Sequence, residues 1–179
     1  MYVNRFHTIL VSIDGNKEIT NKNRGEGTYE KVVANLRSIV AQGFKEEVIA
    51  RMCVEEPTNF FEDIMFLIGA NKKNQNNDFV FTSVHWQLDA NMWHDYKKRN
   101  FSKWSREYNE GVTKLANYWV EQMEQGKVLR LYPFLGVMSS LIFGEKYSLR
   151  CGSGVCNFTI LPNGKISACP IMKIGRAHV

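Results

Sequence analysis

Long apolar segments are missing from this sequence of 179 residues. No run approaches the roughly 20 apolar residues that a helix needs to cross a bilayer, and no signal peptide is visible. We therefore expect a cytoplasmic protein with no membrane partner. Clustered positive charge is missing as well, because the net charge is only +5 and the basic residues are scattered. This pattern disfavours a nucleic-acid partner.

Glycine-rich phosphate loops and cysteines are also scarce. Gly25 and Gly27 lie in a polar stretch rather than directly after a strand, which disfavours a nucleotide-binding doubly wound domain. The chain has four cysteines, of which Cys53 is isolated and is expected to be structural. The other three lie near the C-terminus. In a reducing compartment such a group indicates a metal or iron–sulfur site rather than a disulfide.

Strand-like and helix-like runs alternate along the first two thirds of the chain. The expected strands are residues 8–13, 47–54 and 79–88, and the expected helices are residues 29–42, 59–68 and 102–125. The stretches between them, including 16–27, are expected to be polar loops. This alternation predicts an α/β fold with a parallel sheet, and both a (βα) barrel and a doubly wound sheet fit it. The nearly continuous apolar run at 8–13 predicts a strand buried on both faces.

Polar side chains gather toward the carboxyl end of each expected strand. Because side chains alternate along a strand, residues two apart share a face. The polar residues that share one face are Ser12 and Asp14, Arg51 and Glu55, and His85, Gln87 and Asp89. Parallel α/β folds bind ligands beyond the carboxyl ends of their strands, so these residues favour a ligand site. The alternative is that they pair with one another and only fill the interior.

A hairpin is expected near the C-terminus. Its turn is Pro162-Asn163-Gly164, because Asn-Gly accepts the positive φ that tight hairpin turns require. The flanking strand-like runs are residues 157–161 and 165–168. Such a hairpin would bring Cys169 back toward Cys151 and Cys156, so these three thiols are the candidate metal ligands.

Two sequence blocks resemble a known family. The spacing of Cys151, Gly164 and Cys169 resembles the opening of a SPASM domain, the cluster-binding extension of radical S-adenosylmethionine (SAM) enzymes that modify peptides. The block Ser12-Ile13-Asp14-Gly15, followed by Arg24-Gly25 and Thr28-Tyr29, resembles the fourth-strand block of the radical SAM barrel in the same group. The resemblance implies the C-terminal half of a partial (βα)6 radical SAM barrel, followed by the start of a SPASM cluster-binding hairpin.

The resemblance also implies roles for individual residues. The residues expected to bind SAM are Ser12, Asp14, Arg24, Arg51 and Gln87. A guanidinium at Arg51 suits the SAM carboxylate. Asp89 or His85 is expected to move a proton during catalysis, the alternative being a hydrogen-bonded scaffold. Cys151 and Cys169 are the expected ligands of an auxiliary iron–sulfur cluster, with Cys156 outside the familiar spacing.

The implied function is a radical SAM peptide maturase. Its cofactors would be 4Fe–4S clusters and SAM, which is cleaved to a 5′-deoxyadenosyl radical that attacks a peptide or protein substrate. An electron donor such as ferredoxin or flavodoxin would be a further partner. The alternative from another functional class is a non-catalytic α/β binding module with a cysteine zinc hairpin, although a second Cys-x2-Cys pair is missing.

The sequence departs from the family in two respects that bear on activity, one being that the remaining SPASM cysteines are absent. The Cys-x3-Cys-x2-Cys loop that holds the SAM-cleaving cluster is absent, and we expect it upstream in a longer parent. Residues 174–179 match the translation of a common sequencing adapter. We therefore expect a fragment that is inactive alone and poorly stable, because half a barrel exposes sheet edges. The expected divisions are a barrel part at 1–126, a connection at 127–150, a SPASM part at 151–173 and an artefact at 174–179.

Overall fold

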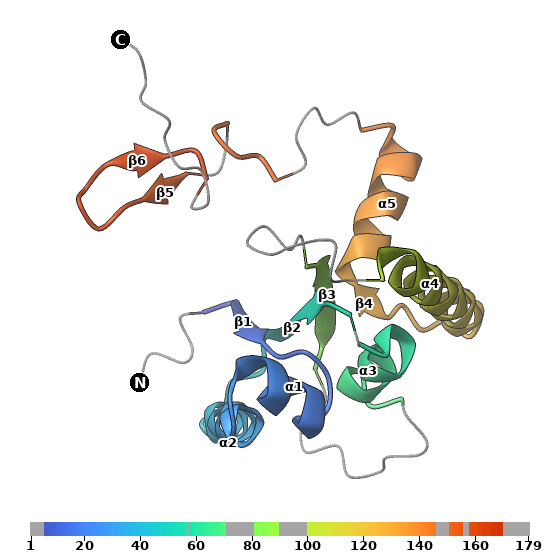
Figure 1. The fold of residues 1–179 in the computed structure, drawn as a ribbon, viewed down its shortest axis with the longest axis horizontal. Coiled ribbons are helices and arrows are strands. Elements are labelled where there is room, and N and C mark those ends of the chain that lie inside the picture. The colour runs from blue at the N-terminus through green and yellow to red at the C-terminus, as the bar shows by residue number, and fades with distance from the viewer. Residues whose placement is uncertain are drawn as a thin grey trace. The chain divides into compact units, whose positions relative to one another are not determined.

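The computed structural model describes residues 6–56, 58–70, 81–89, 100–145, 151–155 and 158–169. The chain divides into two compact units, Met1–Met138 and Ser139–Val179. The first unit is an α/β structure built on a parallel sheet, as expected (Figure 1). The second contains the cysteine-bearing hairpin.

The sheet of the first unit has four parallel strands in the order β1-β2-β3-β4. They are β1 (Thr8–Ser12), β2 (Glu47–Val54), β3 (Ser83–Leu88) and β4 (Arg130–Leu131). The strand predicted at 47–54 is confirmed to the residue. The strand predicted from residue 79 begins only at Ser83; Thr82 instead uses its hydroxyl to bond the backbone N–H and C=O of Val48. Residues 79 and 80 lie outside the described part.

Four helices connect these strands. They are α1 (Lys17–Arg24), α2 (Thr28–Ala41), α3 (Phe60–Leu67) and α4 (Phe101–Glu124). The helices predicted at 29–42, 59–68 and 102–125 are confirmed within one residue at each end. The polar loop predicted at 16–27 is wrong, because α1 occupies most of it. The Asn16 side chain caps α1 by accepting a hydrogen bond of 3.0 Å from the N–H of Ile19.

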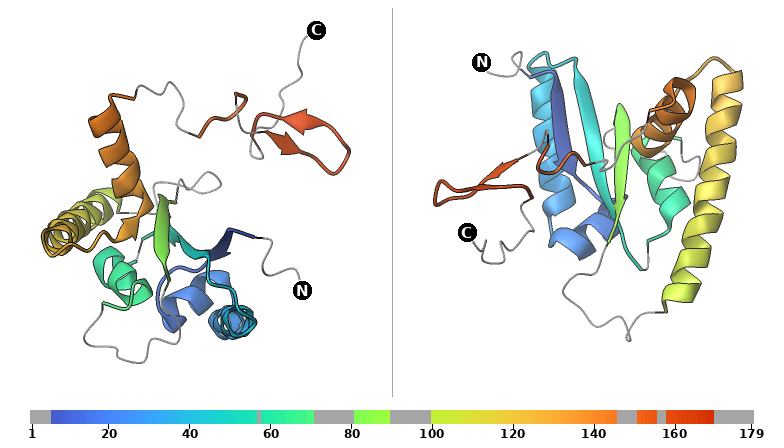
Figure 2. Two further views of the ribbon diagram at one scale, coloured as in Figure 1. Left: turned by 180° about the vertical axis from the view of Figure 1, so that it is seen from behind. Right: turned by 90° about the horizontal axis from the view of Figure 1, so that it is seen from above.

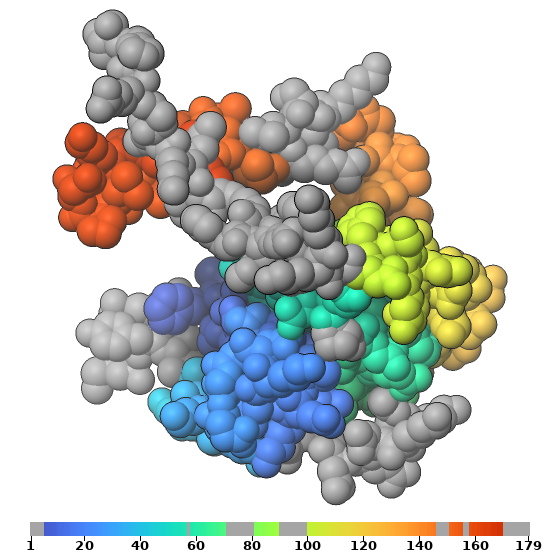
Figure 3. All heavy atoms as spheres, in the orientation of Figure 1, coloured from blue at the N-terminus to red at the C-terminus, as the bar shows by residue number. Residues whose placement is uncertain are grey.

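The helices lie on the same side of the sheet (Figure 2). In the space-filling view, the blue atoms of α1 and α2 adjoin the teal atoms of α3, which adjoin the yellow atoms of α4 (Figure 3). Strand β2 shows the consequence, since its alternate residues facing these helices are at most 3% exposed. These residues are Val48, Ala50, Met52 and Val54. On the other face of β2, Arg51 is exposed.

The core between sheet and helices draws on each helix after α1. Val33 and Leu36 come from α2, Ile64 and Leu67 from α3, and Leu115 and Trp119 from α4. On the opposite face of the sheet, Ile49 and Ser83 are buried at the amino ends of the strands, whereas toward the carboxyl ends the described residues provide no such cover. Leu10 of β1 is 53% exposed. The prediction that residues 8–13 form a strand buried on both faces is therefore wrong.

Residues 127–150, predicted as a connection, contain β4 and the helix α5 (Tyr132–Phe143). Leu131 of β4 is fully buried, and the indole of Trp119 donates to the Leu129 carbonyl at 2.9 Å. These contacts attach the segment to the first unit. The boundary between the two compact units falls inside α5, after Met138.

The second unit contains the predicted hairpin in a shorter form. Strands β5 (Thr159–Ile160) and β6 (Ile166–Ser167) pair antiparallel. The turn closes through a hydrogen bond of 2.8 Å from the N–H of Gly164 to the Leu161 carbonyl, with Gly164 at φ 79°. A positive φ at this position explains why glycine follows Asn163.

No helix among the described residues is long and apolar enough to cross a membrane.

Leu115 tests how α4 is held on the sheet. This side chain is fully buried in the core, whereas Val120 on the same helix is 46% exposed. We expect Leu115→Ala to lower the free energy of unfolding by about 2–4 kcal/mol, because it leaves a cavity. Val120→Ala should change it by less than about 1 kcal/mol. Urea denaturation of both variants measures the difference, and equal losses would contradict the packing described here.

Candidate functional site

The predicted site residues lie on the uncovered face of the sheet. The strand register places Ser12 beside Arg51, and Arg51 beside His85. Two residues further along β2 and β3, Cys53 lies beside Gln87. Ser12, Arg51 and Gln87 are exposed, and His85 is half-buried. The structure thus assembles side chains from three separate strands into two adjacent rows near the carboxyl ends.

Arg51 and Gln87 are joined by a forked contact. The Nε and Nη2 atoms of Arg51 donate to Oε1 of Gln87 at 3.3 and 2.8 Å. This contact holds the guanidinium over the sheet. Its Nη1 atom takes no part in the contact, so the group can still donate to an anion in the way that suits a carboxylate.

Asp14 and Arg24 form an ion pair at the edge of the site. The Arg24 Nη2 atom donates to Asp14 Oδ1 at 2.7 Å, and the same oxygen accepts from the backbone N–H of Cys53 at 2.9 Å. The Asp14 side chain is 1% exposed. The structure therefore places Asp14 as a tie between α1, β1 and β2, whereas the side chains open to a ligand are those of Ser12 and Arg51.

His85 and Asp89 are the predicted proton-transfer residues. Burial and the neighbouring Arg51 guanidinium lower the pKa of His85, so its imidazole is neutral at pH 7. A neutral imidazole can accept a proton at neutral pH. Asp89 directly follows β3, where its N–H donates to the Val54 carbonyl at 2.9 Å. Asp89 thus lies at the carboxyl end of β3, whereas His85 is the third residue of that strand and its ring lies 6.3 Å from that of Tyr132.

Cys53 is half-buried on the open face. Burial, followed by the negative charges of Asp14, Asp89 and Glu55, raises the pKa of its thiol. The thiol is therefore protonated at neutral pH and is a weak nucleophile. This environment agrees with a structural role.

A second polar cluster lies at the amino ends of the strands, and the sequence pattern did not indicate it. Glu47 accepts hydrogen bonds from the hydroxyls of Ser83 and Tyr132, the latter at 2.9 Å to Oε2. Burial alone would raise the pKa of Glu47, but these two bonds and the Arg130 charge together lower it. A cavity of about 260 Å³ adjoins the cluster, and the residues lining it are Thr8, Leu10, Glu47, Ile49, His85 and Tyr132.

Asp63 is a further residue that sequence reasoning missed. It lies in the first turn of α3, is 4% exposed, and its Oδ2 atom has no hydrogen-bond partner within the described part of the chain. Burial raises its pKa to about 7, against hydrogen bonds from the backbone of Asn16 and Asn59. The available signal was an acidic residue directly before Ile64, on the apolar stripe of a short helix.

Gly15 lies directly against Asp63. A Cβ atom at position 15 would come within 2.7 Å of the Asp63 Cγ atom, and Gly15 has φ 137°. Both the close approach and the positive φ exclude a larger residue. The Asp63 carboxyl thus occupies the space beside the turn that follows β1.

Two cysteines of the second unit, Cys151 and Cys169, are free thiols. Cys151 is exposed and Cys169 is half-buried, while Cys156 lies outside the described residues. The hydroxyl of Ser153 donates to the Ala168 carbonyl, so the segment after Cys151 lies against the residue preceding Cys169. Within the described ranges, no three His, Cys, Asp or Glu residues form a group that could hold a metal.

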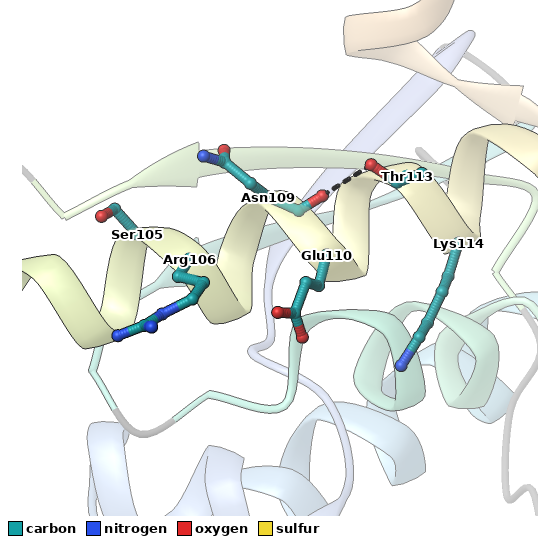
Figure 4. Close-up of a pocket in the computed structure, with 6 residues that line it drawn as sticks. All are labelled: Ser105, Arg106, Asn109, Glu110, Thr113 and Lys114. Atoms are coloured by element: carbon teal, nitrogen blue, oxygen red, sulfur yellow. Dashed lines mark hydrogen bonds between the residues drawn. The ribbon is translucent and has the colours of Figure 1, made fainter.

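The hollow along α4 is not a convergent site. The residues that line this space of about 630 Å³ are Ser105, Arg106, Asn109, Glu110, Thr113 and Lys114, all from one helix. Figure 4 shows Asn109 on one side of the helix and Arg106, Glu110 and Lys114 projecting toward the other. The contact drawn is the bond of 2.9 Å from the Thr113 hydroxyl to the Asn109 carbonyl. These side chains form a solvated helix face.

No protein-family model, curated protein or solved structure matches this chain. A functional interpretation therefore depends on the chain's own residues and their geometry.

The buried carboxyl of Asp63 predicts a pH-dependent stability. Its pKa is about 7 in the folded state against 3.8 for an ordinary Asp, so the folded state binds the proton more tightly. The contribution of Asp63 to stability is then fully present below about pH 4 and is lost progressively as the pH rises to about 7. Asp63→Asn should remove this loss. Between pH 5 and 8, the variant should gain on the order of 3 kcal/mol over the wild type.

Urea denaturation at pH 5, 6.5 and 8 measures this gain. Glu124→Gln is the matched control, because Glu124 is exposed on α4 and should follow the wild type at each pH. Parallel curves for Asp63→Asn and the wild type would show that Asp63 does not hold its proton in the folded state.

Proposed function

We propose that this chain is part of a radical SAM enzyme of the SPASM group that modifies a peptide or protein. The observation that carries this proposal is the row of Ser12, Arg51 and His85 across the face of the parallel sheet opposite helices α1 to α4. Parallel α/β enzymes bind their ligands beyond the carboxyl ends of the strands.

The order of the strands supports the barrel part of the proposal. Strands β1 to β4 follow one another without reversal. Since βα crossovers are right-handed, four strands added in one direction place their helices on one face, as a barrel requires. A doubly wound sheet instead reverses its order and carries helices on both faces. The order therefore favours a partial (βα)6 barrel whose interior is the polar face.

The polar face supports the assignment of SAM as ligand. Arg51 is exposed, is oriented by Gln87, and has a further donor for the carboxylate of a bound amino-acid group. Ser12, its neighbour in register, offers a hydroxyl to the same ligand. Asp14 and Arg24 hold the loop beside it. The bound cofactor would supply the radical chemistry, while these residues bind it, orient it and exclude water.

His85 is the better proposed base of the two candidates. It is kept neutral by burial and by Arg51, and it lies in the same row as Ser12 and Arg51. A neutral imidazole at this position can take a proton from a substrate held over the sheet. Asp89, at the end of β3, would then orient substrate at the rim of the site.

The cysteines fit the proposed clusters unequally. The chain has no Cys-x3-Cys-x2-Cys loop, so its residues do not fit the SAM-cleaving cluster, which another part of the protein would have to supply. Cys151 and Cys169 are free thiols on segments joined through Ser153 and Ala168, and they fit two ligands of an auxiliary cluster. The remaining partners in the proposal are a peptide or protein substrate and an electron donor such as ferredoxin or flavodoxin, in the cytoplasm.

The test is anaerobic expression from the complete gene, with iron counted and 5′-deoxyadenosine release from SAM measured. We expect about eight or more irons per chain, as two 4Fe–4S clusters require. Arg51→Lys should weaken SAM binding about 10- to 100-fold, because an ammonium cannot reproduce the forked contact. Arg106→Lys, on the outer face of α4, is the matched control and should bind as the wild type does.

A different metal content would contradict the proposal. Zinc bound in stoichiometric amount, with no iron and no SAM cleavage, would overturn the proposal and leave a non-catalytic binding module. Equal SAM affinity in Arg51→Lys and the control would refute the proposed role of Arg51.

A further inference from the structure

Asp63 connects helix α3 to the site loop, which consists of Asp14, Gly15 and Asn16. It belongs to α3, whose first turn lies at the carboxyl end of β2, and its carboxyl contacts Gly15 in the turn after β1. The backbone of Asn16 hydrogen-bonds to the same carboxyl. Asp14, which is bonded to Arg24 and to the Cys53 N–H, directly precedes Gly15. The position of the site loop therefore depends on this carboxyl.

The surroundings of Asp63 favour its neutral form. Its Oδ2 atom has no hydrogen-bond partner among the described residues, although the side chain is almost fully buried. The charged groups that act on it are acidic, namely Glu62 on its own helix and Asp14 on the loop. Arg24 of α1 is already bonded to Asp14. From α2, the titratable residue Tyr29 contacts α3, where its ring lies 6.3 Å from that of Phe66.

A metal ion does not account for the unpaired oxygen. Within the described ranges no third His, Cys, Asp or Glu joins a pair of such residues to hold a metal. A proton removes the cost of burying a charge beside the carboxylate of Asp14.

We propose that Asp63 is a positioning residue whose protonated carboxyl holds Gly15 and Asn16 in place, and that its ionisation releases this loop and weakens ligand binding at the open face of the sheet. The loop part stands on the contacts of Asp63, and the ligand part rests on the proposed SAM site. Ionisation places a second negative charge beside Asp14 in a buried environment. The uncompensated oxygen can then be satisfied only by water, which must enter between α3 and the loop.

Nuclear magnetic resonance of the full chain tests the loop part. Between pH 5 and 8.5, the Asp63 side-chain carboxyl carbon should titrate with a midpoint near 7. The amide signals of Gly15 and Asn16 should shift with the same midpoint, and Asp63→Asn should abolish those shifts. Glu124→Gln should leave them unchanged. A carboxyl carbon that titrates near pH 4, or loop amides that titrate equally in Asp63→Asn, would overturn the proposal.

The wild-type titration decides the loop part even if Asp63→Asn does not fold. SAM affinity of the complete protein at pH 6 and pH 8 then tests the ligand part. We expect at least about fivefold weaker binding at pH 8 in the wild type, and equal affinities at the two pH values in Asp63→Asn. Equal affinities in the wild type would overturn the ligand part. Absence of SAM binding at both pH values would instead refute the proposed function, with the loop titration still decided by its own signals.

Discussion

The tie made by the Asp14 carboxylate is the interaction on which the arrangement of the site depends. One oxygen of this nearly fully buried group accepts from Arg24 of α1 and from the backbone of Cys53 in β2. The Asp14 N–H donates to the Thr20 hydroxyl at 3.2 Å. A buried charge of this kind is tolerated only when it is paired and hydrogen-bonded. The residues after β1, the helix α1 and the carboxyl end of β2 are therefore fixed together, and the exposed polar residues lie beside that junction.

The second constraint is that, among the described residues, helices α1 to α4 cover one face of the sheet and leave the carboxyl-terminal part of the other face exposed. The alternation of β2 sends its apolar residues to the helices and leaves Arg51 and Cys53 on the other side. The sequential strand order gives the same result for the neighbouring strands. The side chains of Ser12, Arg51 and Gln87 on that face are exposed, so they are available to a ligand. Fold and site thus follow from the same alternation.

The sequence predicted what is set by local periodicity and missed what is set by tertiary contact. Strand β2 and helices α2, α3 and α4 carry strong apolar patterns, and their predicted bounds agree with the structure. Helix α1 carries few apolar residues; it is held by the Asn16 cap and by Asn21, whose Oδ1 accepts from the Tyr29 N–H at 2.8 Å. Asp63 could be noticed as a carboxylate on an apolar stripe, but its contact with Gly15 joins residues 48 positions apart. No local pattern encodes that contact.

The two polar clusters on the open face differ in whether their charged group is neutralised by a neighbouring residue. At the amino ends of the strands, the Glu47 carboxylate is matched by the hydroxyls of Ser83 and Tyr132 and by Arg130 at 3.5 Å. The negative charge of Glu47 is therefore balanced within that cluster. At the carboxyl ends, the guanidinium of Arg51 is bonded to a neutral amide, so its positive charge is oriented by Gln87 but is not neutralised by it. An oriented cation beside a serine hydroxyl and a neutral imidazole is suited to an anionic ligand. The carboxyl ends of the strands, rather than the amino ends, are therefore the part of the open face where a carboxylate-bearing ligand gains the most.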